Sequence, residues 1–151
     1  MSTSRQKMIA ATRFGFRQLL ELDACTRCGE CVTWCPTFTE KQELDDITPL
    51  RKIERLRSFL RAQALGPLGR LFGFRRATEE TLHMFSTGTY GCTLCGRCAV
   101  VCPVNIQTRS LWIAMRETLV DQGVYPAMLD DLSETLTTHY NISGDANEDR
   151  L

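Results

Sequence analysis

Eight cysteines in two copies of one spacing constrain this 151-residue chain more than any other feature of its sequence. Each copy reads C-x-x-C-x-x-C-x-x-x-C-P. The first run contains Cys25, Cys28, Cys31 and Cys35, and the second contains Cys92, Cys95, Cys98 and Cys102. No cysteine lies outside the two runs. The fold must therefore be organised around two dense groups of thiols.

This spacing is the ligand run of a cubane 4Fe-4S cluster. Three thiolates at a spacing of three residues can wrap a compact loop around one face of a cubane, while the fourth points away. In two-cluster ferredoxins the fourth cysteine of each run ligates the other cluster. We therefore expect two 4Fe-4S clusters, the first held by Cys25, Cys28, Cys31 and Cys102, and the second by Cys92, Cys95, Cys98 and Cys35.

Two other uses of clustered cysteines fit the sequence less well. Structural zinc sites with four cysteines are built from two C-x-x-C pairs, a different layout from a run of three with a fourth before proline. Four disulfides would normally sit in a smaller secreted domain with a leader peptide. The N-terminal sequence MSTSRQKMIAATRFGF has no long apolar core or small-residue cleavage site, so we expect a cytoplasmic protein with reduced thiols.

The charges of the chain are distributed unevenly although its net charge is zero. Residues 1–76 carry 14 Lys and Arg against 8 Asp and Glu, and residues 77–151 carry 4 against 10. Such asymmetry is typical of a docking face or of charge-matched halves. No stretch approaches the roughly 20 consecutive apolar residues of a membrane span, so we expect membrane association through a partner or a surface contact at most.

Residues 36–91, between the two runs, indicate a helical insertion. Thr48 is a typical N-cap before Pro49, which favours a helix start. Apolar side chains then recur on one face at helical spacing, at Leu50, Ile53, Leu56, Phe59 and Leu60. The opposite face is basic, with Arg51, Lys52, Arg55, Arg57 and Arg61. We interpret it first as a solvated face, then as a docking surface for an acidic partner; nucleic-acid binding is disfavoured because the whole chain is neutral.

Further helices are predicted on both sides of the second run. Thr78 is expected to cap a short helix that begins with Glu79 and Glu80. A helix is expected from about residue 107 to 122, ended by Gly123, and another from Pro126 to about Thr138. No segment shows the alternation of a half-buried strand. The predicted fold class is mainly α.

Two complete cysteine runs around a long helical insertion resemble the alpha-helical ferredoxin module. Within that set, LDACTRCGECVTWCPTF and YGCTLCGRCAVVCPV are most similar to the C subunit of heterodisulfide reductase. The segment from Thr138 to Arg150 resembles the H-x-N-P-x-G stretch that follows the last helix in that family, with Ile142 in place of the proline. The resemblance runs from about Leu22 to Arg150. It implies an N-terminal extension (1–22), a two-cluster domain (23–140) and a C-terminal tail that is a candidate partner contact (141–151).

The function we expect is the transfer of single electrons. The sequence has no dinucleotide fingerprint, phosphate loop or spare nucleophilic cysteine, so we expect no catalytic residue and no reaction by the chain on its own. Chains of the glycolate-oxidase type continue into a cysteine-rich catalytic domain, whereas this sequence stops at Leu151 with every cysteine assigned. The resemblance therefore implies a separate cysteine-rich catalytic subunit, heterodisulfide reductase B-like, and a flavin or iron-sulfur donor subunit.

Two alternatives remain open at the level of sequence. One is the iron-sulfur subunit of a quinone-linked dehydrogenase, of the glycolate-oxidase or succinate-dehydrogenase type. The other is a redox-sensing regulatory module that carries clusters and would bind nucleic acid in a salt-sensitive way.

Overall fold

A computed structural model describes residues 9, 11–43, 45–73, 77–146 and 148 of the chain. The predicted extension at 1–22 and the predicted tail at 141–151 therefore lie partly outside the described residues. The described elements are all helical: η1 (Ala11–Arg13), α1 (Phe16–Ala24), α2 (Glu30–Thr33), α3 (Pro36–Glu40), η2 (Asp45–Ile47), α4 (Pro49–Ala64), α5 (Pro67–Leu71), α6 (Glu79–Tyr90), α7 (Arg97–Val100), α8 (Thr108–Asp121) and α9 (Met128–His139). The predicted fold class, mainly α, is confirmed.

The helix boundaries follow the capping residues that the sequence indicates. The Thr48 hydroxyl accepts a hydrogen bond from the backbone N–H of Arg51, so α4 begins at Pro49. The Thr78 hydroxyl likewise accepts from the backbone N–H of Thr81 at the start of α6. Each such cap stabilises its helix by about 1 kcal/mol. At the end of α8, Gly123 has a φ of +64°, as expected of a residue that ends a helix in the left-handed conformation.

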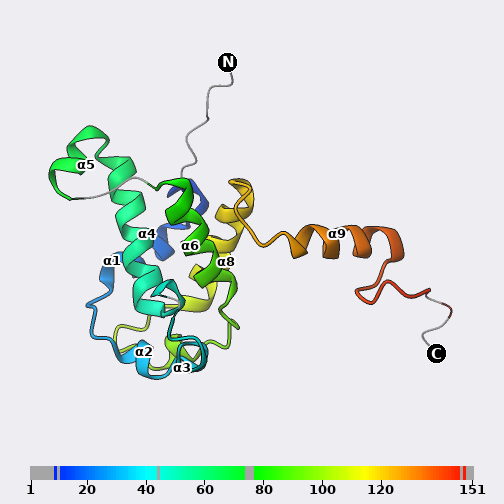
Figure 1. Cartoon of the computed structure of the whole chain (residues 1–151). Coiled ribbons are helices and arrows are strands. Elements are labelled where there is room, and N and C mark those ends of the chain that lie inside the picture. Colours follow the sequence, from blue (N-terminus) through cyan, green and yellow to red (C-terminus); the bar gives the residue numbers. More distant parts are fainter. Residues whose placement is uncertain (1–8, 10, 44, 74–76, 147, 149–151) are drawn as a thin grey trace, which may run out of the picture.

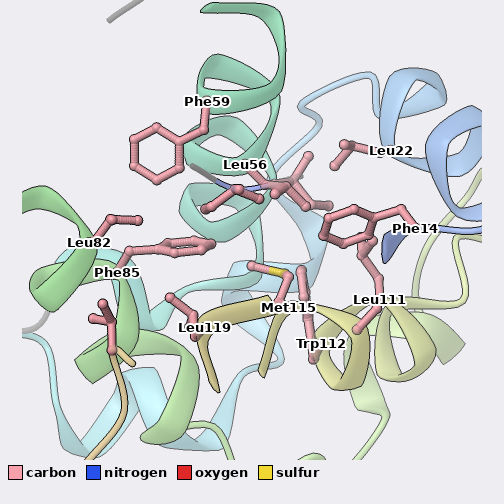
Figure 2. Close-up of a cluster of buried hydrophobic side chains, with 14 of the residues drawn as sticks. Phe14, Leu22, Leu56, Phe59, Leu82, Phe85, Leu111, Trp112, Met115 and Leu119 are labelled. Carbon is pink, nitrogen blue, oxygen red and sulfur yellow. The ribbon is translucent and has the colours of Figure 1, made fainter. Parts of the chain in front are cut away.

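The hydrophobic core lies among α1, α4, α6 and α8 (Figure 1, Figure 2). The rings of Phe59 and Phe85 meet edge to face, with centroids 5.6 Å apart. Trp112 is 1% exposed, and Ile9 and Phe14 from the predicted extension also belong to this core. Each large side chain that is fully buried contributes about 1.5–3 kcal/mol. α1, α4, α6 and α8, rather than the four-residue α2 and α7, therefore supply most of the burial that holds the chain together.

The large area of an aromatic side chain predicts a packing role for both tryptophans, Trp34 and Trp112. Trp112 has that role, whereas Trp34 does not. It is 51% exposed, and its Nε1–H donates to the Glu30 carboxylate within the same turn.

The basic face of α4 is less solvated than the sequence indicates. Lys52 is 1% exposed, and its Nζ lies 4.8 Å from the centroid of the Trp112 ring. Arg55 pairs with the buried carboxylate of Asp46 at 3.1 Å, and the Arg57 side chain is 12% exposed. The interpretation as a solvated face is therefore wrong for Lys52 and Arg57. The physical reason is that α4 contacts α1, α2, α6 and η2, so it has more neighbours than a helix with one buried face.

One helix extends away from the others. In Figure 1, α9 projects from the body formed by α1, α4, α6 and α8, and none of its residues is buried. Among the described residues, no helix combines the length and apolar character needed to cross a bilayer.

A close approach between α6 and η2 gives a test of this packing. A Cβ on Gly88 would overlap the backbone carbonyl of Asp46 and lie 2.8 Å from the Asp46 Cβ. We expect Gly88→Ala to lower the free energy of unfolding by about 1–3 kcal/mol, because backbone must move to accept the methyl group. Thermal unfolding of anaerobically prepared protein measures the loss. Gly15→Ala is the control, since the nearest atom to its Cβ, Gln18 Oε1, is 3.7 Å away. Equal melting temperatures for the two variants would contradict this packing.

Candidate iron-sulfur centres

The two cysteine loops share one unusual backbone conformation. In the first loop the residues on either side of Cys28 have positive φ, +61° at Arg27 and +82° at Gly29. In the second loop the residues on either side of Cys95 match them, with +55° at Leu94 and +80° at Gly96. Left-handed residues within a turn can aim successive backbone N–H groups into a concavity that binds anions, as at many iron-sulfur sites. The loops thus repeat in three dimensions as they do in sequence.

The glycines of these loops are explained by conformation. The sequence predicts that Gly29 and Gly96 allow backbone amides to approach sulfur. In the structure a Cβ on either residue would meet no atom within 4 Å, whereas both have a φ that side chains rarely adopt. The preference for glycine at Gly29 and Gly96 therefore comes from the positive φ of the backbone, which glycine adopts without steric cost.

The two loops lie next to each other at one end of the helical body. The short helix after each loop, α2 in the first and α7 in the second, contacts the other. The ends of the longer helices meet there too, because α1 leads into Cys25 and α6 ends just before Cys92. Figure 1 shows α2 and α3 below the packed helices.

Two cavities at this end contain all eight cysteines among their linings. Each is bordered by the first three cysteines of one run together with the fourth cysteine of the other. The first is lined by Cys25, Cys28, Cys31 and Cys102, and the second by Cys92, Cys95, Cys98 and Cys35. Cys98 borders the first cavity as well, so the two cavities adjoin at this residue.

The donor set of these cavities fits a polynuclear group that binds thiolates. Burial, followed by the neighbouring thiols of Cys98 and Cys25, raises the pKa of Cys31 from 9.0 to about 12. A group that binds several such thiolates must therefore bring positive charge, as iron does. Within the part of the chain that the structure describes, no three His, Cys, Asp or Glu side chains are placed to hold a single metal ion. Thiols spread around a cavity are the donor arrangement of a cubane, which binds each thiolate through a separate iron.

Two arginines bind the chain where it enters the loops. Arg57 of α4 donates to the carbonyl oxygens of Cys25 at 3.2 Å and Asp23 at 3.0 Å. Arg116 of α8 donates to the carbonyl oxygens of Cys92, Thr89 and Tyr90. Each guanidinium thus satisfies carbonyls at the C-terminal end of the helix before the first cysteine of a run. Because that helix end carries partial negative charge, the cation also offsets charge beside a thiolate-rich cavity.

Sequence reasoning assigned no role at the loops to these two arginines. It placed Arg57 on the solvated face of α4 and did not single out Arg116. No local motif marks either residue, since each acts on a loop 24 or more positions away in the chain.

The segment that resembles the H-x-N-P-x-G stretch lies elsewhere. Asn141 is 6% exposed and forms a compact turn: its Nδ2 donates to the carbonyls of His139 and Asp145, and its Oδ1 accepts from Gly144 N–H. The turn therefore forms with Ile142 in place of proline. Figure 1 places it at the far end of α9, away from the cysteine loops.

Comparison with known proteins agrees with this geometry. The chain is 40% identical over 124 residues to the D subunit of the dihydromethanophenazine:CoB–CoM heterodisulfide reductase of Methanosarcina mazei, a match that covers 82% of this chain and 30% of the relative. It is 42% identical over 109 residues to the D subunit of the same enzyme in Methanosarcina acetivorans, covering 72% and 26%. It is 30% identical over 109 residues to the Hdr-like menaquinol oxidoreductase iron-sulfur subunit 2 of Archaeoglobus fulgidus, covering 70% and 19%.

The chain thus spans less than a third of the length of these relatives. The resemblance to heterodisulfide reductases is confirmed; the two Methanosarcina relatives are D subunits, where the sequence suggested the C subunit. No solved structure gives a significant match. Residues 21–106, which contain both cysteine runs and the helices between them, match the model of the 4Fe-4S dicluster domain. The chain therefore belongs to the 4Fe-4S dicluster domain family.

Proposed function

We propose that this chain is an electron-transfer module of a heterodisulfide-reductase-like oxidoreductase, passing single electrons through two 4Fe-4S clusters. The observation that carries the proposal is the pair of adjoining cavities, the first lined by five cysteines and the second by four, with both runs contributing to each. Two redox groups held side by side by the same packed helices can pass an electron from one to the other.

The cavity linings support the crossed assignment of ligands. In this assignment Cys25, Cys28, Cys31 and Cys102 hold the first cluster, and Cys92, Cys95, Cys98 and Cys35 hold the second. Each bound cubane would accept and release one electron at a time. The crossing ligands, Cys35 and Cys102, tie the two halves of the chain to each other through metal.

The residues around the cavities prepare the chain for this role. Arg57 and Arg116 offset negative charge where α1 and α6 enter the loops. Pro49 at the start of α4 borders the second cavity, and Thr108 at the start of α8 borders the first. The partial positive charge of a helix N-terminus favours an anionic group there. Buried apolar residues such as Ile53 and Ile106 line the first cavity and limit the access of water.

The names of the relatives indicate the kind of complex. Three are subunits of a CoB–CoM heterodisulfide reductase. We propose that the chain exchanges electrons with a cysteine-rich catalytic unit that reduces a disulfide, or runs the reverse reaction, and with a flavin or iron-sulfur donor. The chain itself would carry no catalytic residue. The chain spans less than a third of the length of those relatives. The catalytic unit and the donor are therefore part of this proposal.

A second candidate is electron transfer in a quinone-linked enzyme. The observation that favours it is the likeness to Hdr-like menaquinol oxidoreductase iron-sulfur subunits, 30% identical in Archaeoglobus fulgidus and 31% in Archaeoglobus profundus. The chain's own task is the same in both candidates. They differ in the molecule with which the complex exchanges electrons, which is a disulfide in the first candidate and a quinone in the second.

Cofactor content is the first test of the proposal. Protein prepared without oxygen should contain about eight iron atoms and an equal amount of acid-labile sulfide per chain, since two cubanes carry four of each. Iron and sulfide assays, with electron paramagnetic resonance (EPR) after reduction, measure this. Stoichiometric zinc with no EPR signal would contradict the proposal.

The ligand assignment is tested by exchanging the crossing cysteines one at a time. We expect Cys35→Ser to disturb the cluster of the second run and to leave the signal of the other cluster closer to that of the wild type. Cys102→Ser is the matched variant and should do the opposite. EPR spectra of both reduced variants distinguish the two clusters. Damage by Cys35→Ser confined to the cluster of Cys25, Cys28 and Cys31 would mean that each run serves its own site.

The relay role is tested by separating electron uptake from turnover. The isolated chain should be reduced reversibly by an artificial donor and show no reduction of a disulfide substrate. Turnover should appear when a cysteine-rich catalytic subunit of a heterodisulfide reductase is added. Spectrophotometric assays of donor oxidation measure both steps. Disulfide turnover by the isolated chain would show that a catalytic site lies within it.

A further inference from the structure

Cys98 lies where the two cavities adjoin. The residue borders both of them and is 8% exposed. In the proposed assignment its sulfur is a ligand of the second cluster, and the residue also borders the site of the first. An electron that moves between the clusters passes close to this sulfur.

Thr108 lies against that sulfur. It is the first residue of α8, is 2% exposed, and places its Oγ1 at 2.9 Å from Cys98 Sγ. With a free thiol either group could be the donor. A thiolate bound to iron has no proton to give, so in the loaded protein the Thr108 hydroxyl must donate and the sulfur must accept.

Among the residues that the structure describes, the first run shows no counterpart of this hydrogen bond. Among the described residues, Cys98 is the cysteine whose Sγ takes part in a side-chain hydrogen bond. A shift of 67 positions relates each cysteine of one run to its equivalent, and the same shift relates Thr108 to Lys41. Lys41 is exposed and pairs with Glu43 at 4.0 Å. The two otherwise repeated sites therefore differ at the third cysteine.

This difference has an electrochemical consequence. A donor aimed at a ligand sulfur stabilises the reduced cluster more than the oxidised one, because reduction adds negative charge to the site, and hydrogen bonds to sulfur are among the factors that set cluster potentials. Burial strengthens the effect, since little water competes for the sulfur.

We propose that Thr108 is a positioning residue that acts through Cys98 to raise the potential of the second cluster, making it the better electron acceptor of the pair. This inference rests on the proposed two-cluster function and gives it a direction: an electron arriving at the first cluster moves to the second. One electron would leave the first bound cluster, which would be oxidised, and enter the second, which would be reduced, while the hydroxyl would keep its proton.

The test compares Thr108→Val, which keeps the shape and removes the hydroxyl, with Thr108→Ser, which keeps the hydroxyl. The midpoint potentials of both clusters are measured by redox titration followed by EPR, and the Cys35→Ser spectrum identifies the signal of the second cluster. We expect Thr108→Val to lower the equilibrium constant for one-electron reduction of the second cluster about tenfold, or about 59 mV. The potential of the first cluster, whose cavity Thr108 also borders, should shift by less than that of the second, because the hydroxyl contacts Cys98 Sγ, and Thr108→Ser should match the wild type.

Three results would overturn the inference. The potential of the second cluster could be unchanged in Thr108→Val. It could fall equally in Thr108→Val and Thr108→Ser, which would indicate packing rather than the hydroxyl. The wild type could have its second cluster at or below the potential of the first. If Thr108→Val binds its clusters poorly, Thr108→Ala is measured in its place. The comparison of the two cluster potentials in the wild type tests the inference in either case. Clusters that are present with unaltered potentials refute this inference alone, whereas wild-type protein without clusters refutes the proposed function.

Discussion

Crowding of sulfur ligands is the constraint on which the rest of this structure depends. Eight cysteines converge on two adjoining cavities. Burial there, followed by the neighbouring thiols of Cys98 and Cys25, raises the pKa of Cys31, so thiolates are costly in these cavities. Iron can neutralise them from within each cavity. The protein has to supply the remaining compensation from its backbone and from cations nearby.

The helical body is arranged to supply it. α1 and α6 enter the loops with their partially negative C-terminal ends, and each end is bound by a guanidinium, Arg57 for the first and Arg116 for the second. α4 and α8 instead place their partially positive N-terminal ends beside the cavities. The Lys52 ammonium, buried against Trp112, adds a further cation to the interior. α4 and α8 therefore provide core surface, the two arginines and the helix N-termini that favour negative charge.

Local signals in the sequence predicted much of this architecture. The spacing of the cysteines predicted the loops, Thr48 and Thr78 predicted the starts of α4 and α6, and Gly123 predicted the end of α8. Each of these rests on contacts within a few residues. The roles of Lys52, Arg57, Arg116 and Thr108 depend on partners that only the tertiary fold brings near. A charge on an amphipathic helix is ordinarily solvated, and nothing local to α4 indicates that its basic side would be covered.

The central claim is that two clusters lie side by side across Cys98 in one chain. EPR of the fully reduced protein tests it most directly, because unpaired spins on neighbouring clusters interact magnetically. The account predicts a spectrum broadened and split by this interaction, which simplifies to one isolated signal in Cys35→Ser. A fully reduced spectrum equal to the sum of two independent signals, or one that never shows more than one cluster, would contradict it.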